Sequence, residues 1–315
     1  LISGVIDRVR RDNSSEPLKD WVLDRLLPRL TQRSIERVGL RASDSSALRL
    51  VGWALGGQAK ALLADLLVPT LSPTTQRVAI ESLASDDRKF NEFLLRKIPE
   101  LTPAVQQTAW EMLGRKRSGL LVIAFAVDNG ELDPADIPLA VRETIKLSRD
   151  ARVQSAIPVT LFSPAAMPDS VGKYFAAIER QGDPDVGEPV FRKHCASCHA
   201  PEPGGNLVGP ALKSVVKKNA EQILVSILDP NREVDPKYYR VQVLTTNGSI
   251  VVGVLSEETD STLAIVDAQG KRHSLLRKEI ESLQSVKQSL MPSGLEKEIS
   301  PEQMRDLISF LKSSL

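Results

Sequence analysis

Cysteine and histidine are scarce in this chain, which has two cysteines and three histidines among 315 residues. Both cysteines, Cys195 and Cys198, lie in the short run "CASCH" that ends at His199. A structural zinc site needs four ligands, usually supplied as two pairs of Cys or His residues. Because the remaining histidines, His194 and His273, do not form a second pair, the sequence argues against a structural zinc site.

Net charge is also small, since 41 basic residues are balanced by 40 acidic ones. This balance gives no reason to expect a nucleic-acid partner. The longest apolar run covers residues 119–127 and is much shorter than the ~20 residues that cross a bilayer, so we expect no transmembrane segment in this chain. No nucleophile elbow, phosphate-binding loop or metal-hydrolase pattern occurs in the sequence, and we therefore do not expect an enzyme.

The first 180 residues are predicted to be helical and to contain a short repeat. Three similar stretches begin at Leu71, Leu101 and Leu132. In each, a capping residue and a proline mark a helix start, at Ser72–Pro73, Thr102–Pro103 and Asp133–Pro134. A small residue follows at the same place in each stretch and would let helices approach closely: Ala79, Ala109 and Ala140. The pattern predicts a HEAT-like helical repeat domain over residues 1–180, with Trp53 and Trp110 in its core.

A second domain is predicted over residues 181–315. The run "QGDPDVGEP" at 181–189 is rich in Gly, Pro and Asp and marks a boundary. Alternating apolar residues on both sides of Asn247-Gly248 predict a β-hairpin, and a second hairpin is expected to turn near Gln269-Gly270. The tail from Ser300 returns to a capped helix. We therefore expect a mainly α fold with a small β-hairpin insertion at about 237–285.

The order Cys-x-x-Cys-His is the order that covalent haem attachment requires. Two thiols three positions apart form thioethers with the two haem vinyl groups, and the adjacent imidazole binds the iron. A thioredoxin-like redox pair would need a strand before the motif, whereas the helix-like run "DVGEPVFRKH" precedes it. The sequence therefore predicts one covalent haem c on Cys195 and Cys198, with His199 as an iron ligand.

Segments around the motif make residues 182–315 resemble class I c-type cytochromes, and more closely the C-terminal haem-binding domain of large secreted planctomycete proteins. The resemblance is carried by "VGEPVFRKHCASCH", "LVGPAL", "SLMPSGLE" and "DLISFLK". It implies that the helix containing Gly187 and Phe191 crosses the C-terminal helix. The packing face of that C-terminal helix would be Leu307, Phe310 and Leu311.

The resemblance also implies which groups complete the haem site. Gly209 and Pro210 match positions whose backbone orients the proximal imidazole. Met291, in a Met-Pro sequence, matches the distal-ligand loop and would be the sixth iron ligand. The β insertion supplies a rival ligand, His273, so that bis-histidine coordination stays open at this point. His194 comes from the neighbouring helical position and is expected to be exposed.

These features predict a one-electron carrier, because iron with two axial protein ligands has no open position for a substrate. The resemblance implies the haem module of a larger redox protein, periplasmic or otherwise exported, that serves a redox partner protein or an upstream dehydrogenase domain. The start at Leu1, without an apolar leader, leads us to expect a processed form or a piece of a longer protein. The alternative is an interaction scaffold, in which the helical repeat recruits a partner and the haem is structural or sensory.

Overall fold

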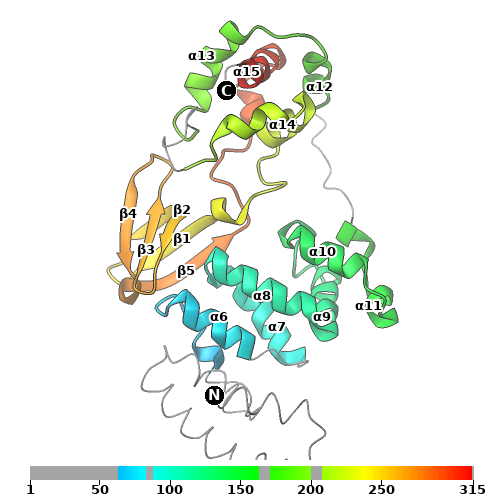
Figure 1. The fold of residues 1–315 in the computed structure, drawn as a ribbon, viewed down its shortest axis with the longest axis vertical. Helices are drawn as coiled ribbons and strands as arrows, with labels where there is room; N and C mark the ends of the chain where they lie inside the picture. The colour runs from blue at the N-terminus through cyan, green and yellow to red at the C-terminus, as the bar shows by residue number, and fades with distance from the viewer. Residues whose placement is uncertain (1–62, 83–87, 163–170, 200–207, 314–315) are drawn as a thin grey trace, which may run out of the picture. The chain divides into compact units, whose positions relative to one another are not determined.

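The computed structural model of this chain describes residues 63–82, 88–162, 171–199 and 208–313 (Figure 1). These residues fall into two compact units. The first takes the described residues up to Leu161 together with Thr259–Ser261, and the second takes Phe162–Glu258 and the described residues from Thr262 onwards. Of the two tryptophans expected in a helical core, Trp53 lies outside the described residues.

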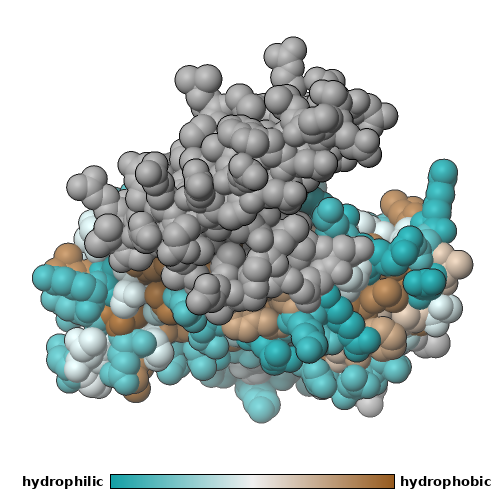
Figure 2. All heavy atoms as spheres, turned by 90° about the horizontal axis from the view of Figure 1, so that it is seen from below, coloured by the Kyte–Doolittle hydropathy of each residue, from teal (hydrophilic) through white to brown (hydrophobic). Residues whose placement is uncertain are grey.

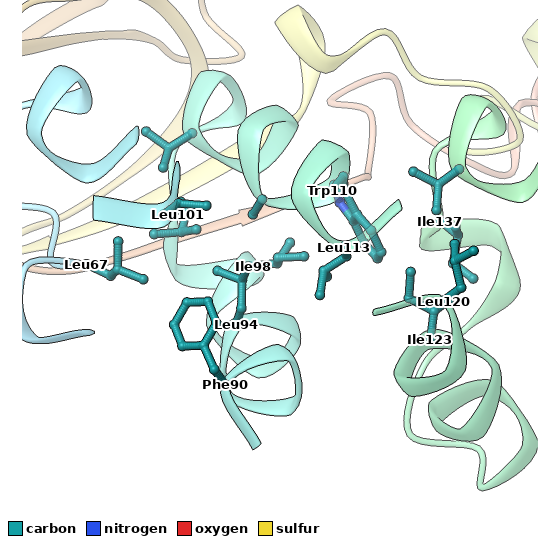
Figure 3. Close-up of a cluster of buried hydrophobic side chains, with 14 of the residues drawn as sticks. Leu67, Phe90, Leu94, Ile98, Leu101, Trp110, Leu113, Leu120, Ile123 and Ile137 are labelled. Carbon is teal, nitrogen blue, oxygen red and sulfur yellow. The ribbon is translucent and has the colours of Figure 1, made fainter. Parts of the chain in front are cut away.

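The first unit is helical in its described part. Its helices are α6 (Pro73–Ser82), α7 (Arg88–Lys97), α8 (Pro103–Arg115), α9 (Arg117–Asp128), α10 (Leu139–Lys146) and α11 (Ala151–Ser155), with short 3-10 helices at Ile98–Glu100, Pro134–Asp136 and Val159–Phe162. Helix α6 packs on α8, and both α7 and α8 pack on α9. Leu94, Leu113 and Ile123 are fully or almost fully buried where these helices meet, and Trp110 lies in the same cluster as predicted (Figure 3).

Two of the three predicted helix starts are confirmed. Helix α6 begins at Pro73, and the amide of Thr75 donates a hydrogen bond to the capping hydroxyl of Ser72 at 3.1 Å. Helix α8 begins at Pro103 as predicted, but the side chain of its N-cap residue, Thr102, makes no capping hydrogen bond. A proline suits this first position because its missing N–H would have no partner inside the helix. The small residues predicted to face neighbouring helices in these two stretches, Ala79 and Ala109, are fully buried.

The third predicted helix start is wrong. Asp133 does cap the backbone, accepting a hydrogen bond from the amide of Ala135 at 2.8 Å, but only the 3-10 helix Pro134–Asp136 follows. A second proline, Pro138, interrupts the segment, because the residue before a proline is disfavoured in helical conformation and Ile137 is extended. Helix α10 starts after Pro138, and Ala140 is exposed instead of packed.

Apolar and polar side chains are interspersed among the coloured residues of Figure 2. Among the described residues, the most exposed large apolar side chains are Leu139 at the start of α10, Leu147 directly after the end of α10, and Ile250 at the start of β2. Single exposed apolar residues of this kind are an ordinary feature of protein surfaces. No helix in the described part of the chain combines the length and the apolar character needed to span a membrane.

The helices of the second unit pack around a crossing of α13 and α15. They are α12 (Gly172–Ile178), α13 (Pro184–His194), α14 (Ala220–Leu228) and α15 (Pro301–Ser313), with 3-10 helices at Leu212–Lys217, Pro236–Tyr238, Arg277–Glu279 and Leu295–Lys297. Helices α13 and α15 lie side by side (Figure 1). Gly187 lies against the backbone of Asp306, and the rings of Phe191 and Phe310 meet with their centroids 5.3 Å apart. The crossing implied by the resemblance is therefore present.

Helix α12 belongs to the same core. The side chain of Tyr174 is fully buried, and its hydroxyl lies 2.7 Å from the carbonyl oxygen of Glu296 and 2.9 Å from that of Ile299. Both carbonyls lie just before α15. Tyr174 therefore connects α12, through hydrogen bonds, to the segment that leads into the C-terminal helix. A buried tyrosine needs such partners because an unpaired hydroxyl in an apolar core is costly.

The second unit also contains a five-stranded antiparallel sheet in the order β4-β3-β2-β1-β5 (Figure 1). Its strands are β1 (Arg240–Thr245), β2 (Ile250–Glu258), β3 (Thr262–Val266), β4 (Arg272–Leu276) and β5 (Ile280–Val286). Both predicted hairpins are confirmed, because β1 pairs with β2 and β3 pairs with β4. Their turns contain Gly248 and Gly270, with φ of 82° and 78°, a conformation that glycine adopts without strain.

The predicted fold class, mainly α with a small β-hairpin insertion, is wrong. Strand β2 pairs with β3 and β5 pairs with β1, so that the hairpins join into one sheet. This sheet has its own buried cluster, which consists of Val241, Val243, Leu263, Ile265, Ile280 and Leu283. The second unit is therefore a combined α and β structure, and the class I cytochrome architecture expected for residues 181–315 is not confirmed.

Strand β5 was not predicted from the sequence, because its apolar residues do not alternate regularly. Its buried residues Ile280 and Leu283 are three positions apart, which breaks the period of two that identifies a half-buried strand. The pairing of β5 with β1 changes register between Leu244 and Thr245, as at a β-bulge. A bulge shifts one strand by a residue relative to its partner, so residues at unequal spacing face the same core.

Candidate haem site

The "CASCH" motif lies at the C-terminal end of α13. The helix ends at His194, and the amides of Cys195 and Ala196 both donate hydrogen bonds to the carbonyl of Phe191, at 2.8 and 3.1 Å. The amide of His199 then donates to the carbonyl of Cys195 at 2.9 Å. Residues 195–199 therefore form a hydrogen-bonded turn that is fixed to the last turn of α13.

The two cysteines pack against different apolar clusters. Cys195 contacts the helical cluster of α13, α14 and α15, which contains Phe191 and Leu307. Cys198 instead packs against a small cluster formed by Val208, Val254 and Val266, the last two from strands β2 and β3. The two sulfur atoms thus lie at the border between a helical apolar surface and an apolar corner of the sheet.

Burial raises the pKa of the Cys195 thiol to about 11, and the neighbouring Cys198 adds to this effect. A thiol with a raised pKa stays protonated at neutral pH, and it is then a poor nucleophile and a poor thiolate ligand. Catalytic Cys-x-x-Cys pairs show the opposite shift. A thioether carries neither charge nor proton, so conversion of Cys195 to a thioether suits its apolar surroundings.

The imidazole of His199 is held by the loop that contains Gly209 and Pro210. Nδ1 of His199 lies 3.0 Å from the carbonyl oxygen of Pro210. Because a carbonyl oxygen can only accept a hydrogen bond, this contact requires the proton on Nδ1. Nε2 is then the nitrogen that is free to bind a metal. The amide of Gly209 donates to the carbonyl of Cys198 at 3.1 Å, which fastens the loop to the motif.

Gly209 leaves the space that the His199 ring occupies. A Cβ atom at this position would lie 2.7 Å from Cε1 and 2.8 Å from Nδ1 of the ring. We therefore expect Gly209→Ala to displace the imidazole and to lower the free energy of unfolding by about 1 to 3 kcal/mol. Urea unfolding of the haem-loaded protein measures this loss. Gly172→Ala is the matched control, since an added Cβ there meets nothing within 4 Å; equal losses in both variants would contradict the close contact.

Met291 packs against the same helical cluster as Cys195. Its loop is held by Asn231, whose Oδ1 accepts a hydrogen bond from the amide of Ser289 at 2.9 Å and whose Nδ2 lies 3.4 Å from the hydroxyl of Ser293. The hydroxyl of Ser289 accepts in turn from the amide of Met291 at 3.0 Å. Sequence reasoning missed Asn231, because the run "DPNREVDP" signals only a turn.

The two other histidines have acidic neighbours. Nε2 of His273, in β4, lies 2.7 Å from Oδ2 of Asp267. Nδ1 of His194 lies 3.4 Å from Oε2 of Glu298. The expectation that His194 is exposed is wrong, since its side chain is only 10% exposed where the segment before α15 packs against it. Neither of these acidic partners belongs to the "CASCH" motif.

The residues of the motif fit haem c better than a bare metal ion. No group of three or more His, Cys, Asp or Glu side chains in the described ranges is placed to hold a metal ion. What surrounds the motif is apolar: Cys195 and Met291 share one cluster, and Cys198 joins another. A macrocycle attached through two thioethers needs such walls and one oriented imidazole, and both are present.

Part of the chain is similar in sequence to a known cytochrome. A region of 42 residues is 52% identical to cytochrome c2 of Rhodoblastus acidophilus. The matched region makes up 13% of this chain and 38% of that protein. This region of the chain is similar in sequence to a c-type cytochrome. The chain spans less than half the length of that cytochrome, and no family model matches the sequence.

Proposed function

We propose that the second unit of this chain is a one-electron carrier with one haem c, bound covalently through Cys195 and Cys198, and with His199 and Met291 as the axial ligands. The observation that carries the proposal is the contact between Nδ1 of His199 and the carbonyl of Pro210. A histidine whose Nδ1 proton is fixed in this way is oriented as a metal ligand, with Nε2 as the binding atom.

Each residue has a separate task in this proposal. Bound haem c supplies a one-electron couple between ferric and ferrous iron. The thiols of Cys195 and Cys198 would anchor the macrocycle, and the apolar cluster around Cys195 and Met291 would exclude water from it. Ligation by the thioether of Met291 favours the reduced state relative to ligation by a second histidine, so we expect a higher potential than in a bis-histidine site.

The resemblance of residues 182–315 to the planctomycete-type domain supports a place in a larger exported or periplasmic redox protein. In this setting a redox partner protein or an upstream dehydrogenase domain would deliver electrons to the haem. An interaction scaffold with a structural or sensory haem is the competing function.

Export from a host with haem-attachment machinery tests the proposed function. The wild-type chain should gain the mass of one haem and should show the spectrum of low-spin haem c. Voltammetry should give one reversible one-electron couple with fast exchange. Haem that binds covalently but gives no reversible couple would favour the scaffold. A chain recovered without haem and with two titratable thiols would contradict the proposal itself.

Met291 is tested separately from covalent attachment. Met291→Ala should abolish the weak red charge-transfer band of Met-ligated ferric haem and lower the reduction potential, because the iron loses its thioether ligand. Optical spectra and voltammetry of the haem-loaded protein measure both changes. Met112→Ala, a partly buried methionine of the first unit, is the matched control and should change neither. The assignment is reversed if Met291→Ala keeps the low-spin spectrum while His273→Ala loses it.

A further inference from the structure

The sheet has two faces, and only one of them forms its own core. The opposite face carries Val254 in β2 and Val266 in β3, which are direct cross-strand partners and are 2% and 3% exposed. Ile250 and Val252, on the same face of β2, are exposed. On this face of β2, burial is therefore concentrated at Val254, which shows that something outside the sheet covers the corner that Val254 forms with Val266 at the end of β3.

The groups that cover this corner come from the haem site. Val254 and Val266 cluster with Val208, and Cys198 and Leu290 pack against them. Val208 directly precedes the Gly209-Pro210 loop, and Leu290 directly precedes Met291. The three segments that carry the proposed attachment and ligand residues thus all send an apolar side chain to one corner of the sheet.

The two strands fit closely at this corner. A Cβ atom on Gly253 would lie 2.6 Å from Cγ2 of Ile265 and 2.7 Å from the carbonyl carbon of Val266. Gly253 therefore lets β2 approach β3 just beside the Val254–Val266 pair. Such close packing makes the corner a rigid surface, because any shift of one strand would move the other.

The turn between β3 and β4 extends this surface to the sulfur of Cys198. The carbonyl oxygen of Ala268 lies 3.9 Å from Sγ of Cys198. Oδ1 of Asp267 accepts hydrogen bonds from the amides of Gln269 at 3.0 Å and Lys271 at 2.9 Å, while Oδ2 lies 2.7 Å from Nε2 of His273. The hydrogen bond from His273 lowers the pKa of Asp267, and the two amides lower it further. Asp267 and His273 thus fix the shape of the turn.

We propose that the sheet forms one wall of the haem crevice, with Val254 and Val266 as its apolar surface and His273 as the positioning residue of the turn that covers Cys198. This inference rests on the proposed function. It gives His273 a role different from the rival axial ligand suggested by the sequence. With haem bound, a wall of this kind would keep water from the part of the site next to Cys198, and burial in apolar surroundings would favour the less charged, reduced iron.

NMR of the wild-type haem protein tests the wall without any substitution. The methyl groups of Val254 and Val266 should change chemical shift strongly between the ferrous and the ferric states, because the paramagnetic iron acts on nearby nuclei. Val243, on the other face of the sheet, serves as the internal reference and should change much less. Equal changes at all three valines would overturn the proposal, since the sheet would then not face the haem.

A pair of matched substitutions tests what the wall does to the iron. Val266→Thr replaces one methyl group beside Cys198 with a hydroxyl of nearly the same size. Because this makes the wall more polar, the substitution should lower the reduction potential. Val243→Thr puts the same group into the core of the sheet, where Val243 is fully buried, and should destabilise the protein but leave the potential unchanged. Equal shifts of the potential in the two variants would contradict a specific wall.

The role of His273 is tested against its neighbour. His273→Ala should speed hydrogen exchange at residues 267–271 and lower the potential, while the optical spectrum stays that of low-spin, Met-ligated haem. Arg272→Ala is the control. Arg272 lies next to His273 in β4, and its substitution removes only an exposed ion pair with Glu257 of β2. If hydrogen exchange at residues 267–271 is unchanged in His273→Ala, His273 does not position the turn. If the wild-type chain carries no haem, the proposed function fails; if it carries a normal haem and these contrasts are absent, only the wall fails.

Discussion

Replacing both Cys195 and Cys198 with alanine will abolish covalent haem attachment. The two thiols lie on one hydrogen-bonded turn, and the described part of the chain contains no other cysteine that could form a thioether. Intact mass after acid-acetone extraction measures the result, since non-covalent haem is removed by this treatment while a thioether survives it. We expect the haem-loaded fraction to fall from nearly complete to none, and each single alanine variant to lose one of the two attachments.

Ser197→Ala is the matched control for this experiment. Ser197 lies between the two cysteines and its hydroxyl is 3.7 Å from Sγ of Cys198, so this substitution alters the same turn without removing a thiol. It should keep full covalent attachment. A double alanine variant that retains haem through extraction would show that attachment does not use the motif. Loss of haem in Ser197→Ala would show instead that the conformation of the turn, and not the thiols alone, is limiting.

Gly187→Ala will strongly destabilise the haem domain, although the change adds a single methyl group. A Cβ atom on Gly187 would lie 2.5 Å from the carbonyl carbon of Asp306 and 2.9 Å from the amide nitrogen of Leu307. These are backbone atoms of α15, which cannot move aside as a side chain would. The helices must separate, and the ring contact between Phe191 and Phe310 must loosen with them. We expect the free energy of unfolding to fall by about 2 to 3 kcal/mol, even after the ~1 kcal/mol that alanine gains in a helix.

Urea unfolding of the haem-loaded protein, followed by haem absorbance and by helical circular dichroism, measures this destabilisation. Gly172→Ala provides the matched control, because it makes the same exchange in α12 of the same unit with open space around the added methyl group. The control should be unchanged or slightly more stable, by up to about 1 kcal/mol. If both variants unfold at the same urea concentration, the close crossing at Gly187 does not contribute to stability.

The chemistry proposed for the haem motif comes from the sequence. The order of Cys195, Cys198 and His199 predicts two thioethers and one imidazole ligand whatever the fold, because all three groups lie within five residues. The helix starts at Pro73 and Pro103 and the glycine turns at Gly248 and Gly270 followed for the same reason. Each depends on the conformational preferences of a few adjacent residues.

Tertiary structure decided the features that join distant segments. The pairing of β5 with β1 made one sheet of two hairpins, and no local pattern predicted it because the register changes at a bulge. Asn231 holds the loop of Met291 from 58 to 62 residues away in sequence. The corner at Val254 and Val266 meets Cys198 only after the whole sheet has formed. Sequence preferences act over a few residues, whereas these contacts depend on which surfaces remain apolar once the local elements exist, and so only packing selects them.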